Sequence, residues 1–236
     1  MIYNPQLGHR VIYACILLIA GLVSAQGQSK YFGINGGPTI AFQKWNGFQE
    51  SNPLLTYHLK AHVESYGQSS AFFANAGISN KGRGIRYNDF VSPISGGLIR
   101  GGYVNVVFKN VELTLGLKKY FELNPYFEFF YSFGLRGSYT YDAKYGQIDY
   151  ITNDATRKWN YGVSAGGGIR WSENEFFRPL LHIIFSPDLS QQVKIPAQEY
   201  VSPSGGTYVL AGQEIRNISL EIGFTLQFLR KVIYRE

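Results

Sequence analysis

The sequence predicts an all-β protein, an eight-stranded antiparallel up-and-down transmembrane β-barrel with meander topology. Apolar and polar residues alternate along most segments, long and short connections alternate between those segments, and aromatic residues gather near both strand ends. Strands of a membrane barrel turn apolar residues outward and polar residues inward, and their connections are short on one side and long on the other. We therefore expect a barrel rather than a soluble β-sandwich.

Length and composition are compatible with one barrel. The chain has 236 residues, of which 16% are charged and 16% aromatic, so it is too aromatic and too sparsely charged for a disordered protein. No run of about 18 apolar residues follows the N-terminal segment, so we expect no transmembrane helix there.

Residues 1–25 are predicted to be a cleaved signal peptide. Arg10 precedes an apolar run from Val11 to Val23, and the small residues Ser24 and Ala25 fit a cleavage site after Ala25. The single cysteine, Cys15, lies inside this segment, so the exported chain would have no cysteine. That excludes disulfides, thiol catalysis and thiolate metal sites. Residues 26–229 are then the barrel, and 230–236 a short basic tail.

The first four strands are predicted at 30–42, 54–66, 71–82 and 103–121. In 54–66 the odd positions Leu55, Tyr57 and Leu59 alternate with Thr56, His58 and Lys60. Positions 111–118 repeat this pattern, with apolar residues at the odd positions, whereas the first and third segments alternate more weakly. A strand sorts such residues onto two faces and a helix does not.

The last four strands are predicted at 125–141, 158–171, 176–188 and 214–229. Apolar residues occupy odd positions from Phe127 to Leu135 and even positions from Ile218 to Phe228. Pro38 and Pro179 fall inside predicted strands, where proline removes a ladder donor. We expect a bulge or a strand end at each proline.

The predicted connections sort by length. Those at 43–53, 83–102, 142–157 and 189–213 are long, and those at 67–70, 122–124 and 172–175 are short. Short turns lie on the periplasmic side of outer-membrane barrels, so both termini would be periplasmic. Aromatic residues such as Tyr31 and Tyr120 lie near the short connections, and others such as Tyr57 and Trp159 near the long ones, as expected for two membrane interfaces.

The polar strand faces predict a filled lumen, because an eight-stranded barrel is narrow enough for side chains to fill it. Charges buried there must be paired or hydrogen-bonded. The predicted lumen network comprises His58, Lys60, His62, Glu64, Glu112, Lys118, Glu128, Arg136, Arg170 and Glu221, and Tyr126 is expected beside them. A structural plug explains this near-balance of charge best, and a ligand or ion path is the alternative.

No catalytic, cofactor or metal signature is recognised. His58 and His62 would lie about 13 Å apart along one strand, at roughly 3.3 Å per residue, so one metal ion cannot bridge them. A zinc site needs three or four converging ligands. Serines and histidines are present, but no spacing selects a nucleophile with its base. We therefore expect no enzyme activity, no cofactor and no metal.

Several segments resemble the PorT-like outer-membrane β-barrel family of Bacteroidota. Residues 32–37 (Phe-Gly-Ile-Asn-Gly-Gly) and 76–82 resemble the family's first and third strands, and residues 110–121 resemble its segment that ends in a Lys-Tyr-Tyr-Phe-like sequence. Asn160–Ile169 and Ser219–Phe228 resemble its sixth and last strands. Thr114 stands where the family usually has proline. The resemblance implies an outer-membrane barrel and supplies no catalytic residues. The family takes its name from a secretion component.

The sequence thus predicts a non-enzymatic integral protein of the cell outer membrane with a plugged lumen. Its expected role is surface interaction, envelope integrity or support of protein secretion. A lipid-modifying barrel enzyme and a narrow channel are the alternatives. The formal charge of +6 comes from scattered residues. We therefore expect outer-membrane lipid, lipopolysaccharide or other envelope proteins as partners, and no nucleic acid. The oligomeric state is left open.

Overall fold

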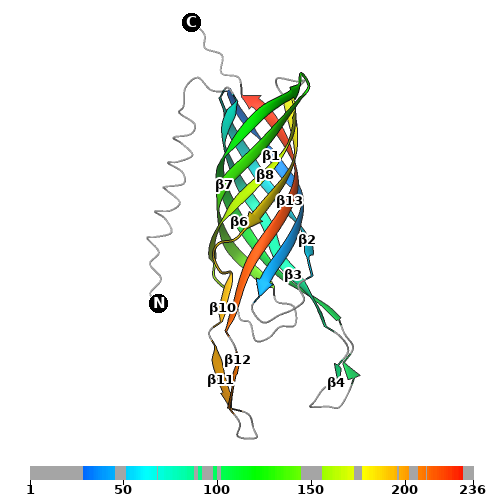
Figure 1. Cartoon of the computed structure of the whole chain (residues 1–236), viewed down its shortest axis with the longest axis vertical. Coiled ribbons are helices and arrows are strands. Elements are labelled where there is room, and N and C mark those ends of the chain that lie inside the picture. Colours follow the sequence, from blue (N-terminus) through cyan, green and yellow to red (C-terminus); the bar gives the residue numbers. More distant parts are fainter. Residues whose placement is uncertain are drawn as a thin grey trace, which may run out of the picture.

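A computed structural model shows a closed antiparallel barrel of eight strands in meander order, which confirms the predicted fold class (Figure 1). It describes residues 29–45, 52–67, 69–87, 90–91, 98–99, 102–144, 156–172, 177–195, 197–201, 207–210 and 212–230. The predicted signal peptide and residues 231–236 of the predicted tail lie outside these ranges.

The barrel strands keep close to the predicted segments. They are β1 (Ser29–Trp45), β2 (Leu54–Tyr66), β3 (Ser70–Tyr87), β6 (Gly102–Asn124), β7 (Phe127–Lys144), β8 (Trp159–Trp171), β9 (Phe177–Pro187) and β13 (Gln213–Arg230). Each pairs with the next, and β13 pairs with β1 from Lys30↔Arg230 to Trp45↔Ile215, so the sheet has no free edge.

The long connections contain strands that the sequence did not predict. They are β4 (Phe90–Val91) paired with β5 (Leu98–Ile99), β11 (Gln198–Val201) paired with β12 (Thr207–Leu210), and β10 (Val193–Ile195) paired with β13. β3 also runs to Tyr87 rather than stopping at 82, because its ladder with β6 continues to Tyr87↔Gly102. Backbone pairing does not require apolar and polar side chains to alternate. The alternation in the sequence therefore stops at 82, although the strand continues. All these elements lie at the long-connection end of the barrel (Figure 1).

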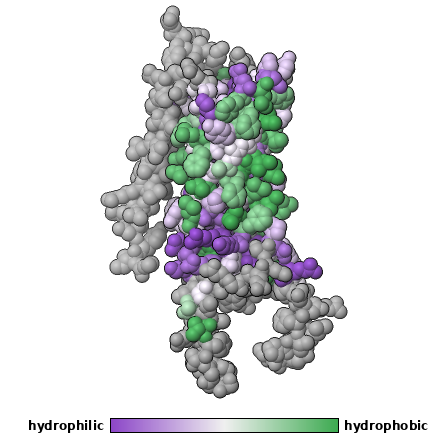
Figure 2. Space-filling view, viewed as in Figure 1, coloured by the Kyte–Doolittle hydropathy of each residue, from purple (hydrophilic) through white to green (hydrophobic). Residues whose placement is uncertain are grey.

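The outer face of the barrel is apolar and the inner face polar. Leu55, Leu117 and Leu135 are 72%, 63% and 66% exposed, whereas Glu64, Arg83 and Arg170 are fully buried. This inverts the arrangement of a soluble protein and is the arrangement of a membrane barrel. Figure 2 shows the apolar zone as a band along the barrel, with hydrophilic residues beyond it at the long-connection end. The described residues include no helix that is long and apolar enough to span a membrane.

The two prolines behave differently. Pro38 pairs with Tyr57 of β2, and the ladder with β13 skips Gly37 and Pro38 but resumes in the same register at Thr39↔Glu221. The expected bulge or strand end at Pro38 is therefore wrong, since two missing pairs within β1 accommodate the ring. At Pro179 the ladder with β8 stops, its last pair being Arg170↔Leu180, while Pro179 still pairs with β13. The β8 ladder therefore ends at this proline, but β9 itself continues to Phe177 without a bulge, so the predicted bulge or strand end at Pro179 is also wrong.

A large bulge between β9 and β10 shapes the lumen. Pro187 pairs with Ile218 and Val193 with Ile215, so the five residues 188–192 oppose the two residues 216–217. Asp188, Ser190 and Gln192 are buried as a result. Bulges re-aim side chains in this way, and here they place additional polar groups inside the barrel mouth.

Candidate functional site

The candidate site is the barrel lumen, which two charge clusters fill. The strands place all the predicted lumen residues on the inner face: His58, Lys60, His62, Glu64, Glu112, Lys118, Arg136, Arg170 and Glu221 are buried, and the side chain of Glu128 is 12% exposed. Tyr126 was expected among them, but it lies in the turn between β6 and β7 and is 56% exposed. The predicted strand at 125–141 began two residues too early, and that placed Tyr126 in a strand.

The first cluster, called the Glu112 cluster, comprises Lys60, Lys81, Glu112, Arg136, Asp188 and Glu221. The Glu112 carboxylate lies 2.6 Å from Lys81 Nζ, 3.1 Å from Lys60 Nζ and 3.9 Å from Arg136 Nε.

Each cation of this cluster also contacts a second carboxylate. Lys60 Nζ lies 2.8 Å from Glu221, Lys81 Nζ lies 3.3 Å from Asp188, and an Arg136 guanidinium nitrogen lies 2.5 Å from Asp188. Three cations and three carboxylates therefore neutralise one another without water access.

The second cluster, called the Glu64 cluster, comprises His62, Glu64, Lys118, Tyr120, Glu128, Arg170 and Gln227. One oxygen of Glu64 accepts hydrogen bonds from Lys118 Nζ at 2.7 Å and from the Gln227 amide at 3.0 Å. The other oxygen accepts one from the Tyr120 hydroxyl at 2.6 Å. Neutral donors therefore share the solvation of this carboxylate with a cation.

Arg170 covers the Glu64 cluster toward the short turns. Its Nε donates to Glu128 at 2.6 Å, and its guanidinium carbon lies 3.8 Å from the Tyr120 ring centroid and 4.6 Å from that of Tyr66. A guanidinium stacks on aromatic faces more readily than an ammonium does. The charge of Arg170 is thus held by two rings and two carboxylates, Glu128 and the more distant Glu64 at 3.7 Å.

The lumen histidines have separate partners. His58 contacts Thr39 Oγ1 at 2.9 Å and Asn35 Oδ1 at 3.3 Å, and His62 Nδ1 lies 2.6 Å from Asn75 Oδ1. His182 is 4% exposed, and its Nε2 has no hydrogen-bond partner among the described residues. Within those residues no group of three or more His, Cys, Asp or Glu could hold a metal ion.

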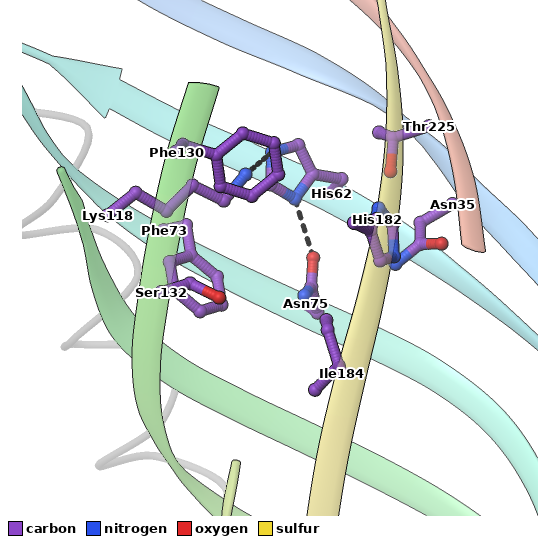
Figure 3. Close-up of a pocket in the computed structure, with 10 residues that line it drawn as sticks. All are labelled: Asn35, His62, Phe73, Asn75, Lys118, Phe130, Ser132, His182, Ile184 and Thr225. Carbon is purple, nitrogen blue, oxygen red and sulfur yellow. Dashed lines mark hydrogen bonds between the residues drawn. The ribbon is translucent and has the colours of Figure 1, made fainter. Parts of the chain in front are cut away.

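A small cavity lies beside the Glu64 cluster (Figure 3). His182 and Asn35 border it on one side, and Lys118, Phe130 and Ser132 on the other. The centre of a water molecule can lie anywhere within about 10 Å³ of this cavity. That is room for one water molecule and little more. The cavity is too small for a metabolite or a lipid chain.

Apolar side chains close both ends of the charged lumen. Trp45, Val106, Phe108, Val193 and Ile215 form a buried cluster at the long-connection end, and Ala71, Tyr120, Phe130 and Leu180 form one at the short-turn end. Arg83 stacks over Trp45 with its guanidinium carbon 4.6 Å from the ring centroid. An ion crossing the lumen would have to displace both apolar clusters and the paired charges between them.

Several lumen residues were not predicted. Lys81 lies near the end of the weakly alternating third segment, and Asp188 lies at the last position of the predicted seventh strand, followed by the unforeseen bulge. Tyr31 and Tyr120 were predicted at a membrane interface, yet they are 3% and 4% exposed and point inward. Their positions share the inward parity of Asn35 and Lys118, and this parity was the signal that could have placed them.

One ion pair lies on the outer face beyond the apolar band. Lys109 Nζ is 2.9 Å from Asp142 Oδ2. The hydrogen bond between them lowers the pKa of the Asp142 carboxyl and raises the pKa of the Lys109 ammonium.

No protein-family model matches the sequence, and no curated protein sequence matches it either. Among solved structures, the chain is similar to the attachment invasion locus protein Ail of Yersinia pestis in complex with the heparin analogue sucrose octasulfate. That similarity has 10% identity over 86% of this chain and 100% of the other, with a TM-score of 0.40.

Two further structures are similar at the same level. The outer-membrane protein OprG of Pseudomonas aeruginosa has 13% identity over 85% of this chain and 97% of that one, with a TM-score of 0.45. The outer-membrane protease OmpT of Escherichia coli has 9% identity over 88% and 99%, with a TM-score of 0.43. The barrel itself is established by the closed strand pairing described above.

Proposed function

We propose that this chain is a non-enzymatic integral outer-membrane protein, a closed barrel that presents its long connections at the cell surface. The observation that carries this proposal is the filled lumen. Paired charges occupy its middle, apolar clusters close its ends, and the cavity beside the Glu64 cluster accommodates one water. The exposed apolar outer face supports insertion into a bilayer.

The rigid barrel serves as a support for the surface segments. Two of the long connections contain paired strands, β4–β5 in one and β11–β12 in the other, so part of each of these two has its own backbone pairing. Binding residues often lie on loops positioned by such a scaffold. Binding of a partner at the cell surface is therefore the main role that we propose for this chain. Because of the resemblance to the PorT-like family, we propose that this surface acts in the support of protein secretion or in envelope integrity.

Orientation is the experimentally accessible part of the proposal. The chain is predicted to be exported through a cleaved signal peptide, with both termini and the short turns in the periplasm. An epitope inserted between residues 203 and 204, in the β11–β12 connection, should bind antibody on intact cells. The same epitope inserted at the turn of Pro125 and Tyr126 should bind only after the outer membrane is opened. The opposite labelling pattern, or recovery of the protein in the soluble fraction, would contradict the proposal.

Absence of enzyme activity is tested through the lumen histidines, which are the candidate acid–base groups. Cells that carry the His58→Ala, His62→Ala and His182→Ala variant should show the same lipid A mass profile as cells with the unmodified protein. A profile that changes in the variant, at equal protein level in the outer membrane, would favour a lipid-modifying enzyme instead.

A further inference from the structure

The rim of the barrel at the long-connection end carries a belt of basic side chains. Its members are exposed or half-buried, lie just beyond the apolar band and are called the basic belt: Lys44, Lys109, Lys144, Arg157, Lys158, Lys194 and Arg216. Around the ring they follow the order β6, β7, the residues before β8, β10, β13 and β1, and β2 and β3 contribute none. The belt is therefore one continuous arc rather than scattered charge.

The strand registers fix the height of the belt. Phe42 pairs with Ile218 at the edge of the apolar band, and the next outward pair along the same two strands is Lys44 with Arg216. On β6, Lys109 follows the exposed Val111 in the same way. The belt thus begins within one outward residue of the lipid-facing surface, at the depth of the lipid headgroups. Figure 2 shows hydrophilic residues gathered beneath the apolar band at this end.

Few acids neutralise the belt. Among the described residues, the acids on this part of the outer face are Asp142, which pairs with Lys109, and Glu214, which lies opposite Lys194. Lys44 and Arg216 lie directly opposite each other in the antiparallel pair. Like charges in such positions repel each other and destabilise the pair unless an anion lies between them.

The opposite rim differs. At the short-turn end Lys30, Lys119 and Glu122 face outward on the described strands, Lys119 donates a hydrogen bond to Ser69, and Lys30 lies opposite Arg230 in the β1–β13 pair. Basic residues are therefore more numerous at one membrane face, the face that the loop lengths assign to the cell exterior. A general need for solubility would not favour one rim.

We infer that the basic belt binds the phosphate groups of the outer-leaflet glycolipid, the lipid A class. Lys44 and Arg216 lie at one end of the arc and directly opposite each other, close enough together to hold one phosphate with an ammonium and a guanidinium. Charge-assisted hydrogen bonds from these groups to phosphate oxygens are among the stronger polar contacts. The exposed apolar band directly beneath would contact the acyl chains of the same molecule. The inference rests on the proposed outer-membrane location, which the epitope labelling tests independently.

The test is the binding of bisphosphorylated lipid A to the purified, folded full chain in detergent, followed by native mass spectrometry. The double variant Lys44→Gln/Arg216→Gln should bind about tenfold more weakly, because each cation at an anionic surface contributes appreciably to binding. Arg157→Gln/Lys158→Gln provides a second variant within the belt and should also weaken binding. The matched control is Lys30→Gln/Lys119→Gln at the other rim, which should bind as the unmodified protein does.

Two ligand controls make the result specific. Lipid A without phosphates should bind the unmodified protein about as weakly as the bisphosphorylated form binds the double variant. Phosphatidylglycerol should bind more weakly than lipid A. Equal binding by the unmodified protein and both belt variants would overturn the inference, as would equal binding of phosphatidylglycerol. Native mass spectrometry of the folded barrel does not depend on where the protein lies in the cell. A negative binding result is therefore distinguishable from a failure of the proposed function, which the epitope labelling would reveal.

Discussion

The two charge clusters of the lumen are built on different chemistry. Glu112 is contacted by three cations, and each of these cations also contacts another carboxylate. Glu64 has two cations, Lys118 at 2.7 Å and Arg170 at 3.7 Å. It also accepts hydrogen bonds from the neutral groups Tyr120 and Gln227. The Glu112 cluster is thus a network of ion pairs that share their partners. In the Glu64 cluster, neutral protein groups take the place of water around the carboxylate.

This difference determines how each cluster tolerates damage. Removing Glu112 takes a carboxylate from three cations at once and leaves them with two carboxylates, and breaking a buried ion pair costs far more than the pair itself contributes. A glutamine in place of Glu64 keeps one acceptor oxygen, so Tyr120 can still donate to it, whereas the donors at the second oxygen lose their acceptor. The Glu112 cluster should therefore be the more sensitive of the two.

The largest effect is expected for Glu112→Gln. Lys60, Lys81 and Arg136 would then share two carboxylates, and the free energy of unfolding should fall by about 3–5 kcal/mol. Urea titration in lipid vesicles, followed by tryptophan fluorescence, measures this change. Glu122→Gln, at an exposed position near the end of β6, is the control. If Glu112→Gln lowers the free energy of unfolding by less than about 1 kcal/mol, as an ordinary surface substitution does, Glu112 does not stabilise the ion-pair network.

Glu64→Gln should cost less, about 2 kcal/mol, which is the scale of a hydrogen bond to a charged group. The amide still accepts from Tyr120, and Arg170 keeps Glu128. Adding Lys118→Met removes the cation left without its carboxylate, so the double variant should recover part of the loss in the same titration. A double variant less stable than Glu64→Gln would mean that Lys118 stabilises the lumen independently of Glu64.

Packing between the strands should give a smaller effect. A Cβ added to Gly223 would lie 2.2 Å from His182 Nε2 and 2.9 Å from Asn35 Oδ1, whereas nothing lies within 4 Å of one added to Gly137. Gly223→Ala should therefore lower the free energy of unfolding by about 1–2 kcal/mol as the His182 ring moves, and Gly137→Ala should leave it unchanged. Equal stability of the two variants would show that His182 moves freely.

The smallest effect is expected outside the lumen. The side chains of Lys109 and Asp142 are 33% and 40% exposed, and exposed ion pairs contribute little because water and salt screen them. Lys109→Gln should leave the urea midpoint unchanged within error. A shift comparable to that of Glu64→Gln would show that the rim contributes to barrel stability as the lumen does.

The barrel and most of its lumen residues could be predicted from the sequence for one physical reason. Opposite environments on the two faces impose period-two alternation, and β2 displays it in nearly every residue, from Leu55 outward to Lys60 inward. It failed where another constraint prevailed. Tyr120 is aromatic yet inward-facing because its hydroxyl reaches Glu64, and Asp188 depends on pairing across the barrel that no local pattern encodes. The basic belt became visible only when strand registers placed residues from distant segments at one height.

Single-channel recording in planar bilayers tests the closed lumen most directly. The purified protein should insert without single, reproducible conductance steps, because paired charges and apolar clusters occupy the whole path. Uniform openings of constant size from the unmodified protein would contradict a closed lumen and favour the narrow channel.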